Sequence, residues 1–293
     1  MTMEVATQNR QDRKALVARL WPGAATFPRP LLAGGGHAPI LCYHSVHPVY
    51  DGPIDPLSPV RFEEHLHFLK SAYTPIALEQ LVMSLRTGAP LPPNPVVLTF
   101  DDGYRDNYEV VFPLLRKHRV PATIYLVSDF IAGRITMSED RNWDALRPEW
   151  IREMDASGLV SFGAHTCSHA LLSSLPDAQA RREVRESKDA VEQVLGHAIT
   201  EFAYPNGRGR DISRAAIAEV EASGFTSACS TIWGTHHTAR DLYWLNRVMI
   251  TSFDTADVLA QKAAGKYDYL HYVHTTDAWW QGKTAGLGMK AAR

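Results

Sequence analysis

Cysteine is scarce in this sequence, and so are long hydrophobic runs and any excess of charge. The 293 residues include three widely spaced cysteines with no CxxC pair, which argues against a disulfide framework and against a cysteine zinc site. No uninterrupted apolar stretch approaches the ~20 residues that a membrane-spanning helix needs. The formal net charge is −2, so a general binder of nucleic acid or of anionic membranes is not expected.

The N-terminal residues are polar and show no apolar core of a secretory signal. Pro22, Pro28 and Pro30 interrupt the candidate stretch. We therefore expect a cytoplasmic protein, with peripheral attachment or export by another route left open. Residues 1–36 are predicted to form an extension with a short helix over 11–21, and residues 37–293 a single domain. The sequence predicts no oligomeric state.

Short apolar runs alternate with amphipathic segments along most of the chain. Strands are predicted at 39–43, 96–100, 121–127, 160–164, 202–204, 225–229, 244–250 and 267–271. Helices are predicted from Pro59, after an N-cap at Ser58, and at 77–85, 107–118, 143–157, 177–195, 212–223 and 255–264. Residues 129–142 are predicted as loop. This α/β alternation predicts a parallel sheet, and its length fits a closed or nearly closed (β/α) barrel better than an open sheet.

Two adjacent carboxylates, Asp101 and Asp102, follow the predicted strand at 96–100. Neighbouring anions repel each other, so a bound cation is the usual reason for holding them at a strand end. Asp102-Gly103 alone is also a common turn sequence. In such folds the catalytic and binding residues lie at the carboxyl ends of the parallel strands. Other polar residues at or just after predicted strand ends are His44, His165 and Tyr204.

A second motif places two histidines, His165 and His169, four residues apart. On a helical turn that spacing puts both side chains on one face, where they can share a metal. Two imidazoles and one carboxylate leave coordination positions open, a set that suits catalytic Zn²⁺ and also Fe²⁺, Co²⁺ or Ni²⁺. Other closely spaced histidines are predicted to be solvated or partly packed; they are His65, His67, His236 and His237.

The third motif, residues 202–207, is predicted to be a loop that aims a backbone N–H inward. Pro205 fixes one backbone angle and Gly207 relaxes another. An ordinary turn is the alternative interpretation of this segment.

The order of these motifs resembles that of the polysaccharide deacetylases, the NodB-homology domain of carbohydrate esterase family 4. The matching elements are Tyr43-His44, Thr99-Phe100-Asp101-Asp102-Gly103-Tyr104, His165-Thr166-Cys167-Ser168-His169 and Phe202-Ala203-Tyr204-Pro205-Asn206-Gly207. The resemblance covers residues 38–265, and the FAYP form is similar to a subgroup that includes poly-N-acetylglucosamine deacetylases. It implies a distorted (β/α) barrel of about seven parallel strands.

The resemblance also implies roles for individual residues. The metal ligands would be Asp102, His165 and His169, with zinc the usual ion and Co²⁺, Ni²⁺ or Fe²⁺ as alternatives. Asp101 would be the catalytic base, and the backbone N–H of Asn206 would stabilise the oxyanion. The residues assigned to substrate binding are Tyr104, Tyr204 and Pro205.

Two features depart from the family pattern. Many members carry an arginine in the third motif that braces the catalytic aspartate, whereas this chain has Ala203 there; Arg247 is the candidate replacement. The Leu-x-His near the family's C-terminus has no clean match, so His44, His271 and His274 compete for the role of general acid. We assign His44, because it directly follows a strand and matches the Tyr-His of the subgroup.

The predicted function is metal-dependent hydrolysis of an N-acetyl group on an amino sugar, as polysaccharide, oligosaccharide or lipid-linked sugar, with release of acetate. Two alternatives stay open. One is hydrolysis of another small amide, such as a formyl group or a cyclic imide, at the same site. The other is a non-catalytic carbohydrate-binding protein. The N-acyl compound that yields free amine and acid separates the two enzymatic hypotheses.

Overall fold

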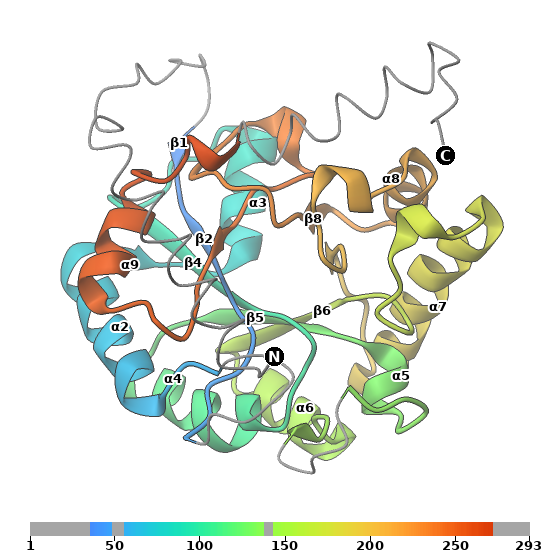
Figure 1. Cartoon of the computed structure of the whole chain (residues 1–293), viewed down its shortest axis with the longest axis horizontal. Helices are drawn as coiled ribbons and strands as arrows, with labels where there is room; N and C mark the ends of the chain where they lie inside the picture. Colours follow the sequence, from blue (N-terminus) through green and yellow to red (C-terminus); the bar gives the residue numbers. More distant parts are fainter. Residues whose placement is uncertain (1–35, 49–55, 138–142, 272–293) are drawn as a thin grey trace, which may run out of the picture. The chain divides into compact units, whose positions relative to one another are not determined.

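Parallel strands form the main sheet of the computed structural model, which describes residues 36–48, 56–137 and 143–271 (Figure 1). Along the sheet the strands follow the order β10, β2, β4, β5, β6, β7, β8, and each neighbouring pair is parallel. Their bounds are Ile40–Tyr43 (β2), Pro95–Phe100 (β4), Ala122–Leu126 (β5), Val160–Ala164 (β6), Glu201–Ala203 (β7), Ser227–Cys229 (β8) and Val248–Met249 (β10). The predicted α/β class with about seven parallel strands is confirmed.

Residues 245–250 join the two edges of this sheet. Leu245 forms a parallel bridge with Cys229 of β8, and Val248 pairs with Leu41 of β2. The Leu245 N–H donates to the carbonyl of Ala228 at 2.8 Å. The sheet therefore curls into a distorted barrel, and the joining segment carries Arg247.

Strand residues alternate between the two faces of the curled sheet, as the two-residue period of a strand requires. On β4, Leu98 and Phe100 pack in the apolar core that the sheet shares with helices, while Val97 belongs to a second cluster. Thr99 and Asp101 continue the Val97 face. The carboxylate of Asp101 is thereby directed to the inside of the barrel at the end of β4.

Helices connect the strands and surround the sheet (Figure 1). Their bounds are Pro59–Ala72 (α2), Leu78–Thr87 (α3), Phe112–His118 (α4), Ser128–Ile131 (α5), Pro148–Ala156 (α6), Asp177–Leu195 (α7), Arg214–Ala222 (α8) and Ala256–Ala263 (α9). Helix α2 begins at the predicted cap, because the Ser58 hydroxyl accepts from the Arg61 N–H at 3.3 Å. Helix α7 buries one face at spacings of four, three and four residues: Ala180, Val184, Ser187 and Val191.

Several predicted elements are corrected. Residues 267–271 are not a strand: they form a turn that becomes helical, with the His271 N–H donating to the Asp268 carbonyl at 3.0 Å. Only Val248–Met249 of the predicted strand 244–250 pairs as β10, because the segment must cross from β8 to β2. Helix α5 lies in the predicted loop 129–142, and the helix predicted over 143–157 begins only at Pro148.

Smaller features were not predicted from the sequence. Residues 107–111 form a π-helical turn before α4. The two-residue strand β3 (Thr74–Pro75) pairs with β4, and β1 (Gly36–His37) pairs antiparallel with β9 (His236–His237). The helix predicted over 11–21 lies outside the described residues. Within the described ranges, no helix is both long and apolar enough to span a bilayer.

Candidate active site

The three predicted metal ligands lie together at the carboxyl ends of β4 and β6. The Oδ1 atom of Asp102 is 3.6 Å from His165 Nε2 and 3.3 Å from His169 Nε2. All three ligand atoms lie within 4.8 Å of one another. Asp102 and His165 are buried, whereas the His169 side chain is 27% exposed, so the cluster opens to solvent on one side.

The protonation pattern of this cluster fits a bound cation. The Nδ1 atom of His165 lies 2.8 Å from the Ala203 carbonyl, so Nδ1 carries the proton and the Nε2 lone pair faces Asp102. Burial, the largest influence, lowers the pKa of His165 to about 4 and keeps the ring neutral. Asp102 Oδ1 is buried without a hydrogen-bond donor. A divalent metal would satisfy lone pairs that otherwise repel one another, and two imidazoles with one carboxylate are ligands that zinc accepts.

The loop that carries both histidines is not the helical turn predicted from their spacing. Residues 165–171 are irregular, and Thr166 and His169 have φ angles of 64° and 59°. The two histidines therefore come together near Asp102 through a geometry other than the predicted helical face. Left-handed backbone at the two positions, rather than one helical face, turns the imidazoles toward Asp102.

Glu183 on α7 holds this loop in place, and the sequence did not indicate it. Its carboxylate accepts from the N–H groups of Cys167 at 2.9 Å and Ser168 at 3.0 Å, and from the Ser168 hydroxyl at 2.8 Å. These bonds satisfy the backbone between the two histidines. Glu183 is one of several acids on a charged helix, so no sequence pattern distinguishes it.

Replacing Glu183 with Ala is expected to weaken metal binding about tenfold or more, because residues that orient ligands contribute at this scale. Metal affinity is measured by competition with a chelator of known affinity. Glu186→Ala on the same helix is the matched control, since Glu186 forms an ion pair with the exposed Arg182 at 2.7 Å. Equal affinities of the two variants would show that Glu183 does not organise the loop.

Arg247 lies against Asp101, as the missing brace at Ala203 led us to expect. Its Nη1 and Nη2 atoms donate to Oδ1 and Oδ2 of Asp101, both at 2.7 Å. Nε donates to the Ser230 carbonyl at 2.8 Å, and Nη1 also contacts the Thr99 hydroxyl at 3.2 Å. The guanidinium is fully buried. This fork-to-fork pair fixes the orientation of the Asp101 carboxylate.

Burial alone would raise the pKa of Asp101, but Arg247 overcomes it and, with His165 and His44 contributing, the pKa falls well below its usual range. The carboxylate is therefore ionised in the folded protein. A lowered folded-state pKa stabilises the fold above the unfolded-state pKa, and this contribution is lost as the pH falls through the folded-state value.

Arg247→Ala is expected to move the acidic limb of the pH–rate profile upward by about one to three pH units, since an adjacent cation lowers a carboxylate pKa by that amount. Leaving a buried anion unpaired should also destabilise the protein by about 3–5 kcal/mol near neutral pH, and less in acid where Asp101 takes up a proton. Urea unfolding and pH–rate profiles measure both effects. Arg247→Lys keeps the charge and should shift the limb less. An unchanged limb in Arg247→Ala would exclude the brace.

His44 lies beside the same carboxylate at the end of β2. Its Nε2 atom is 4.0 Å from Asp101 Oδ2, and its side chain is 26% exposed. The His44 carbonyl accepts from Asn107 Nδ2 at 3.1 Å, which fixes the backbone at this position. His271 Nδ1 instead lies 3.1 Å from the Trp233 carbonyl. His274 lies outside the described residues.

The motif at 204–207 brings a backbone donor to the same end of the sheet. Asn206 is exposed with φ 56°, and its carbonyl accepts from the Thr231 hydroxyl. Gly207 has φ 63°, and a Cβ at this position would lie 2.7 Å from the Thr231 nitrogen, so glycine is required. Contacts with Thr231 thus fix the loop backbone, as the prediction of an oriented N–H at Asn206 requires.

Burial corrects the predicted substrate contacts. Tyr104 is 2% exposed and packs edge-on against Phe130 and Trp143. Burial and then the charge of Asp102 raise its pKa well above the usual value. Tyr204 is 1% exposed and donates to the Tyr243 carbonyl at 3.2 Å, and Pro205 is buried as well. These side chains support the site from beneath and present no surface to a sugar.

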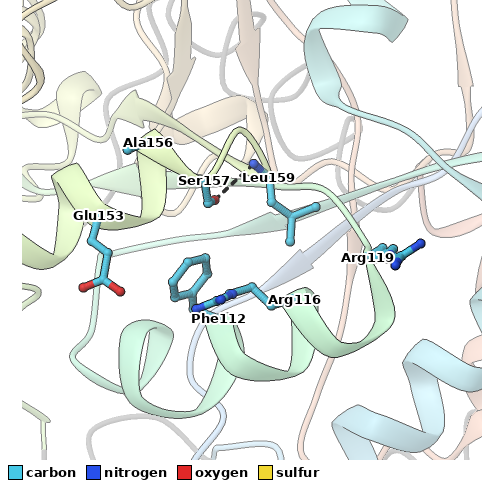
Figure 2. A pocket seen from close by; sticks show the side chains of 7 residues that line it. All are labelled: Phe112, Arg116, Arg119, Glu153, Ala156, Ser157 and Leu159. Atoms are coloured by element: carbon cyan, nitrogen blue, oxygen red, sulfur yellow. Dashed lines mark hydrogen bonds between the residues drawn. The ribbon is translucent and has the colours of Figure 1, made fainter.

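A hollow of 510 Å³ lies elsewhere, between α4 and α6, and Figure 2 shows the side chains that line it. Its lining includes Arg119 and Leu159, which shortly precede the first residues of β5 and β6. The hollow therefore lies at the opposite end of these strands and contains none of the predicted site residues.

Comparison with known proteins agrees with this geometry. The polysaccharide deacetylase family model matches residues 88–227, a range that includes the metal cluster but neither His44 nor Arg247. The Bacillus subtilis protein YxkH, which has polysaccharide deacetylase in its name, is 27% identical over 214 residues, 73% of this chain and 71% of that protein. The poly-beta-1,6-N-acetyl-D-glucosamine N-deacetylase of Escherichia coli K12 is 32% identical over 111 residues. That match covers 36% of this chain and 16% of the relative.

The solved structure of the Streptococcus pyogenes deacetylase PplD in complex with acetate has the same fold. It superposes with a TM-score of 0.68 at 24% identity, covering 77% of this chain and 97% of that one. The matched domain and the relatives lead to one conclusion: residues 88–227 form a polysaccharide deacetylase domain, and the protein is a hydrolase that acts on carbon–nitrogen bonds other than peptide bonds.

Proposed function

We propose that this protein removes the N-acetyl group from an amino sugar by hydrolysis, with a divalent metal held by Asp102, His165 and His169. One observation carries the proposal: Arg247 fixes an ionised carboxylate, Asp101, which directly precedes the ligand Asp102 in the chain and interacts electrostatically with the ligand His165. A base next to a metal cluster that opens to solvent is the arrangement that amide hydrolysis requires. Zinc is the ion that we propose, with Co²⁺, Ni²⁺ or Fe²⁺ as alternatives for this donor set.

Asp102, His165 and His169 would hold a metal that, when bound, would lower the pKa of a water molecule and polarise the acetyl carbonyl. The residues of the chain supply the remaining steps. Asp101 takes a proton from the attacking water as the new carbon–oxygen bond forms. The N–H of Asn206 donates to the oxygen that becomes negative. His44 gives a proton to the sugar nitrogen, and the carbon–nitrogen bond breaks to leave free amine and acetate.

The relatives support a polymeric substrate. The E. coli relative is named for a poly-beta-1,6-linked N-acetylglucosamine, and we propose that this chain acts on N-acetylglucosamine polymers or oligomers. The test is acetate release by the purified, metal-loaded full chain from β-1,6-linked and β-1,4-linked N-acetylglucosamine oligomers, with N-formylated oligomers and a cyclic imide alongside. Acetate from the N-acetyl sugars is expected. Release of formate or ring opening without acetate would assign the protein to the other small amides, and no turnover of any of them would favour a binding protein.

The partly exposed imidazole of His44 leads to a further prediction. His44→Ala should lower turnover by about 100-fold or more, because the leaving amine then departs without a general acid. An N-acetyl anilide with an electron-withdrawing ring leaves more easily, so it should recover part of the loss. His271→Ala is the matched control and should be milder. A severe His271 variant together with a near-normal His44 variant would move the acid to the other histidine.

A further inference from the structure

A second cluster of two histidines and one carboxylate lies on the helices, away from the active site. Glu63 and His67 are four residues apart on α2, so both project from one face of that helix. His118 is the last residue of the neighbouring α4. In Figure 1 the two helices lie next to each other outside the sheet, and residues of the two helices are in contact.

The contacts bring the three side chains close together. His118 Nε2 is 2.8 Å from Glu63 Oε1, and the rings of His67 and His118 meet edge to face with centroids 4.7 Å apart. One ligand atom from each residue can be chosen so that all three lie within 4.8 Å. His118 is buried, Glu63 is half-buried and His67 is exposed. The donor set is the same as at the candidate active site.

An ionised carboxylate is available to a cation at this position. Lys117 Nζ lies 2.7 Å from Glu63 Oε1. Hydrogen bonds from Lys117, and next from His118, lower the pKa of Glu63 to about 2, so a carboxylate is present at neutral pH. The Lys117 side chain is 64% exposed and can turn away into solvent. An incoming metal ion would therefore replace a mobile ammonium group rather than bring charge into an apolar core.

We propose that Glu63, His67 and His118 bind a divalent transition-metal ion, with zinc as the probe of choice, and that this ion links α2 to α4. Ligand atoms around tetrahedral zinc are about 3.3 Å apart, given bonds near 2.0–2.1 Å. His118 Nε2 and Glu63 Oε1 lie 2.8 Å apart as a hydrogen-bonded pair, so a metal would displace the Nε2 proton and separate the two atoms by about 0.5 Å. The exposed imidazole of His67 completes the set by rotating toward them. His67 is exposed and its ring contacts that of His118, in agreement with the predicted solvated or partly packed position. This site does not depend on the proposed deacetylase activity.

The link has a measurable consequence for folding. The three ligands come from two helices that are separated in the sequence by β3, α3 and β4, so the unfolded chain does not present them together. A ligand that binds the folded state alone stabilises it by mass action. Zinc should therefore raise the melting temperature of a protein whose active-site ligands have been removed.

The decisive experiment counts zinc by equilibrium dialysis of the full chain against a series of free Zn²⁺ concentrations. Wild type should bind about two ions. His67→Ala and Glu63→Gln should each bind about one, and so should His165→Ala with His169→Ala. His197→Ala is the control and should bind about two, because His197 pairs with Asp155 on the surface but has no second imidazole in its ion pair. His67 is exposed, so its variant is expected to fold normally.

Each outcome decides between the two sites. One ion in wild type that is lost only from His165→Ala with His169→Ala would overturn the helix site and leave the active site intact. One ion lost only from His67→Ala would support the helix site and count against the proposed active-site metal. Lys117→Ala adds a second readout: zinc affinity at the helix site should rise severalfold once the competing ammonium is gone. An unchanged or lower affinity would show that these residues form an ion-pair network and not a metal site.

Discussion

Asp101→Asn is expected to lose most hydrolytic activity while it retains its metal. The amide is nearly isosteric with the carboxylate, but it cannot accept a proton from water, and the loss of a general base costs about 10²–10⁴ in rate. Asp101 is not one of the three clustered ligands, so metal content should stay near that of wild type. Turnover of an N-acetylated oligosaccharide and metal analysis of the same sample measure the two quantities together.

Asp102→Asn is the matched comparison, since it makes the same replacement of one oxygen by an NH2 group in the neighbouring carboxylate. It removes an anionic ligand and should lose metal as well as activity. The two variants therefore separate proton transfer from ligation. Near-normal turnover in Asp101→Asn together with retained metal in Asp102→Asn would show that the two roles are assigned incorrectly.

Combined replacement of His165 and His169 by Ala is expected to have the largest effect on metal binding. One carboxylate is left from the three-residue set, and a single carboxylate holds a transition metal weakly in water. Activity should fall to background, and added zinc should not restore it. His65→Ala is a suitable control, because His65 is a buried histidine that contacts the Asp254 carbonyl at 2.8 Å and lies in no metal cluster of the described residues.

The ion at the active site can be counted separately from the ion at the helix site. Zinc analysis of the double variant on a His67→Ala background should give a value near zero, whereas the His67→Ala protein alone retains the active-site ion. Full occupancy in the triple variant would remove Asp102, His165 and His169 from the metal site.

The strands and the residues at their ends could be predicted because the signal is local. The run Val96 to Phe100 is apolar and rich in β-branched side chains, and Asp101 and Asp102 interrupt it at the position where the strand ends. A parallel sheet then brings the ends of β4 and β6 to the same side. This is enough to place Asp102 near His165, whereas the position of His169 depends on the loop that follows β6.

The supporting contacts could not be predicted in the same way. Arg247 reaches Asp101 from 146 positions along the chain, and only the alanine at position 203 gave a reason to search for it. Glu183 has no such indication, because its partners are backbone N–H groups that any residue carries. Long-range partners of this kind depend on how the barrel closes, and the periodic pattern of apolar residues in the sequence does not predict that closure.

The substrate contacts predicted at Tyr104 and Tyr204 fail for a related reason. A motif carried over from a family identifies which residues lie near a site, but the side of the backbone that each one faces is decided by packing. Both rings turn into the protein, where one packs against Trp143 and the other donates to a carbonyl. Residues that contact the sugar are therefore to be sought among exposed positions of the same loops, such as Asn206.

The position of Arg247 makes the proposed activity depend on complete folding of the barrel. The segment that joins the first and last edges of the sheet also carries the cation that keeps the base ionised. A chain in which this seam has not formed has no counter-ion for Asp101, so the carboxylate either takes up a proton or opposes burial. We therefore expect partly folded molecules to lack the proposed activity even where the metal ligands are already assembled. A single arginine thus couples closure of the barrel between β8 and β2 to the ionisation of Asp101, the residue proposed to take the first proton.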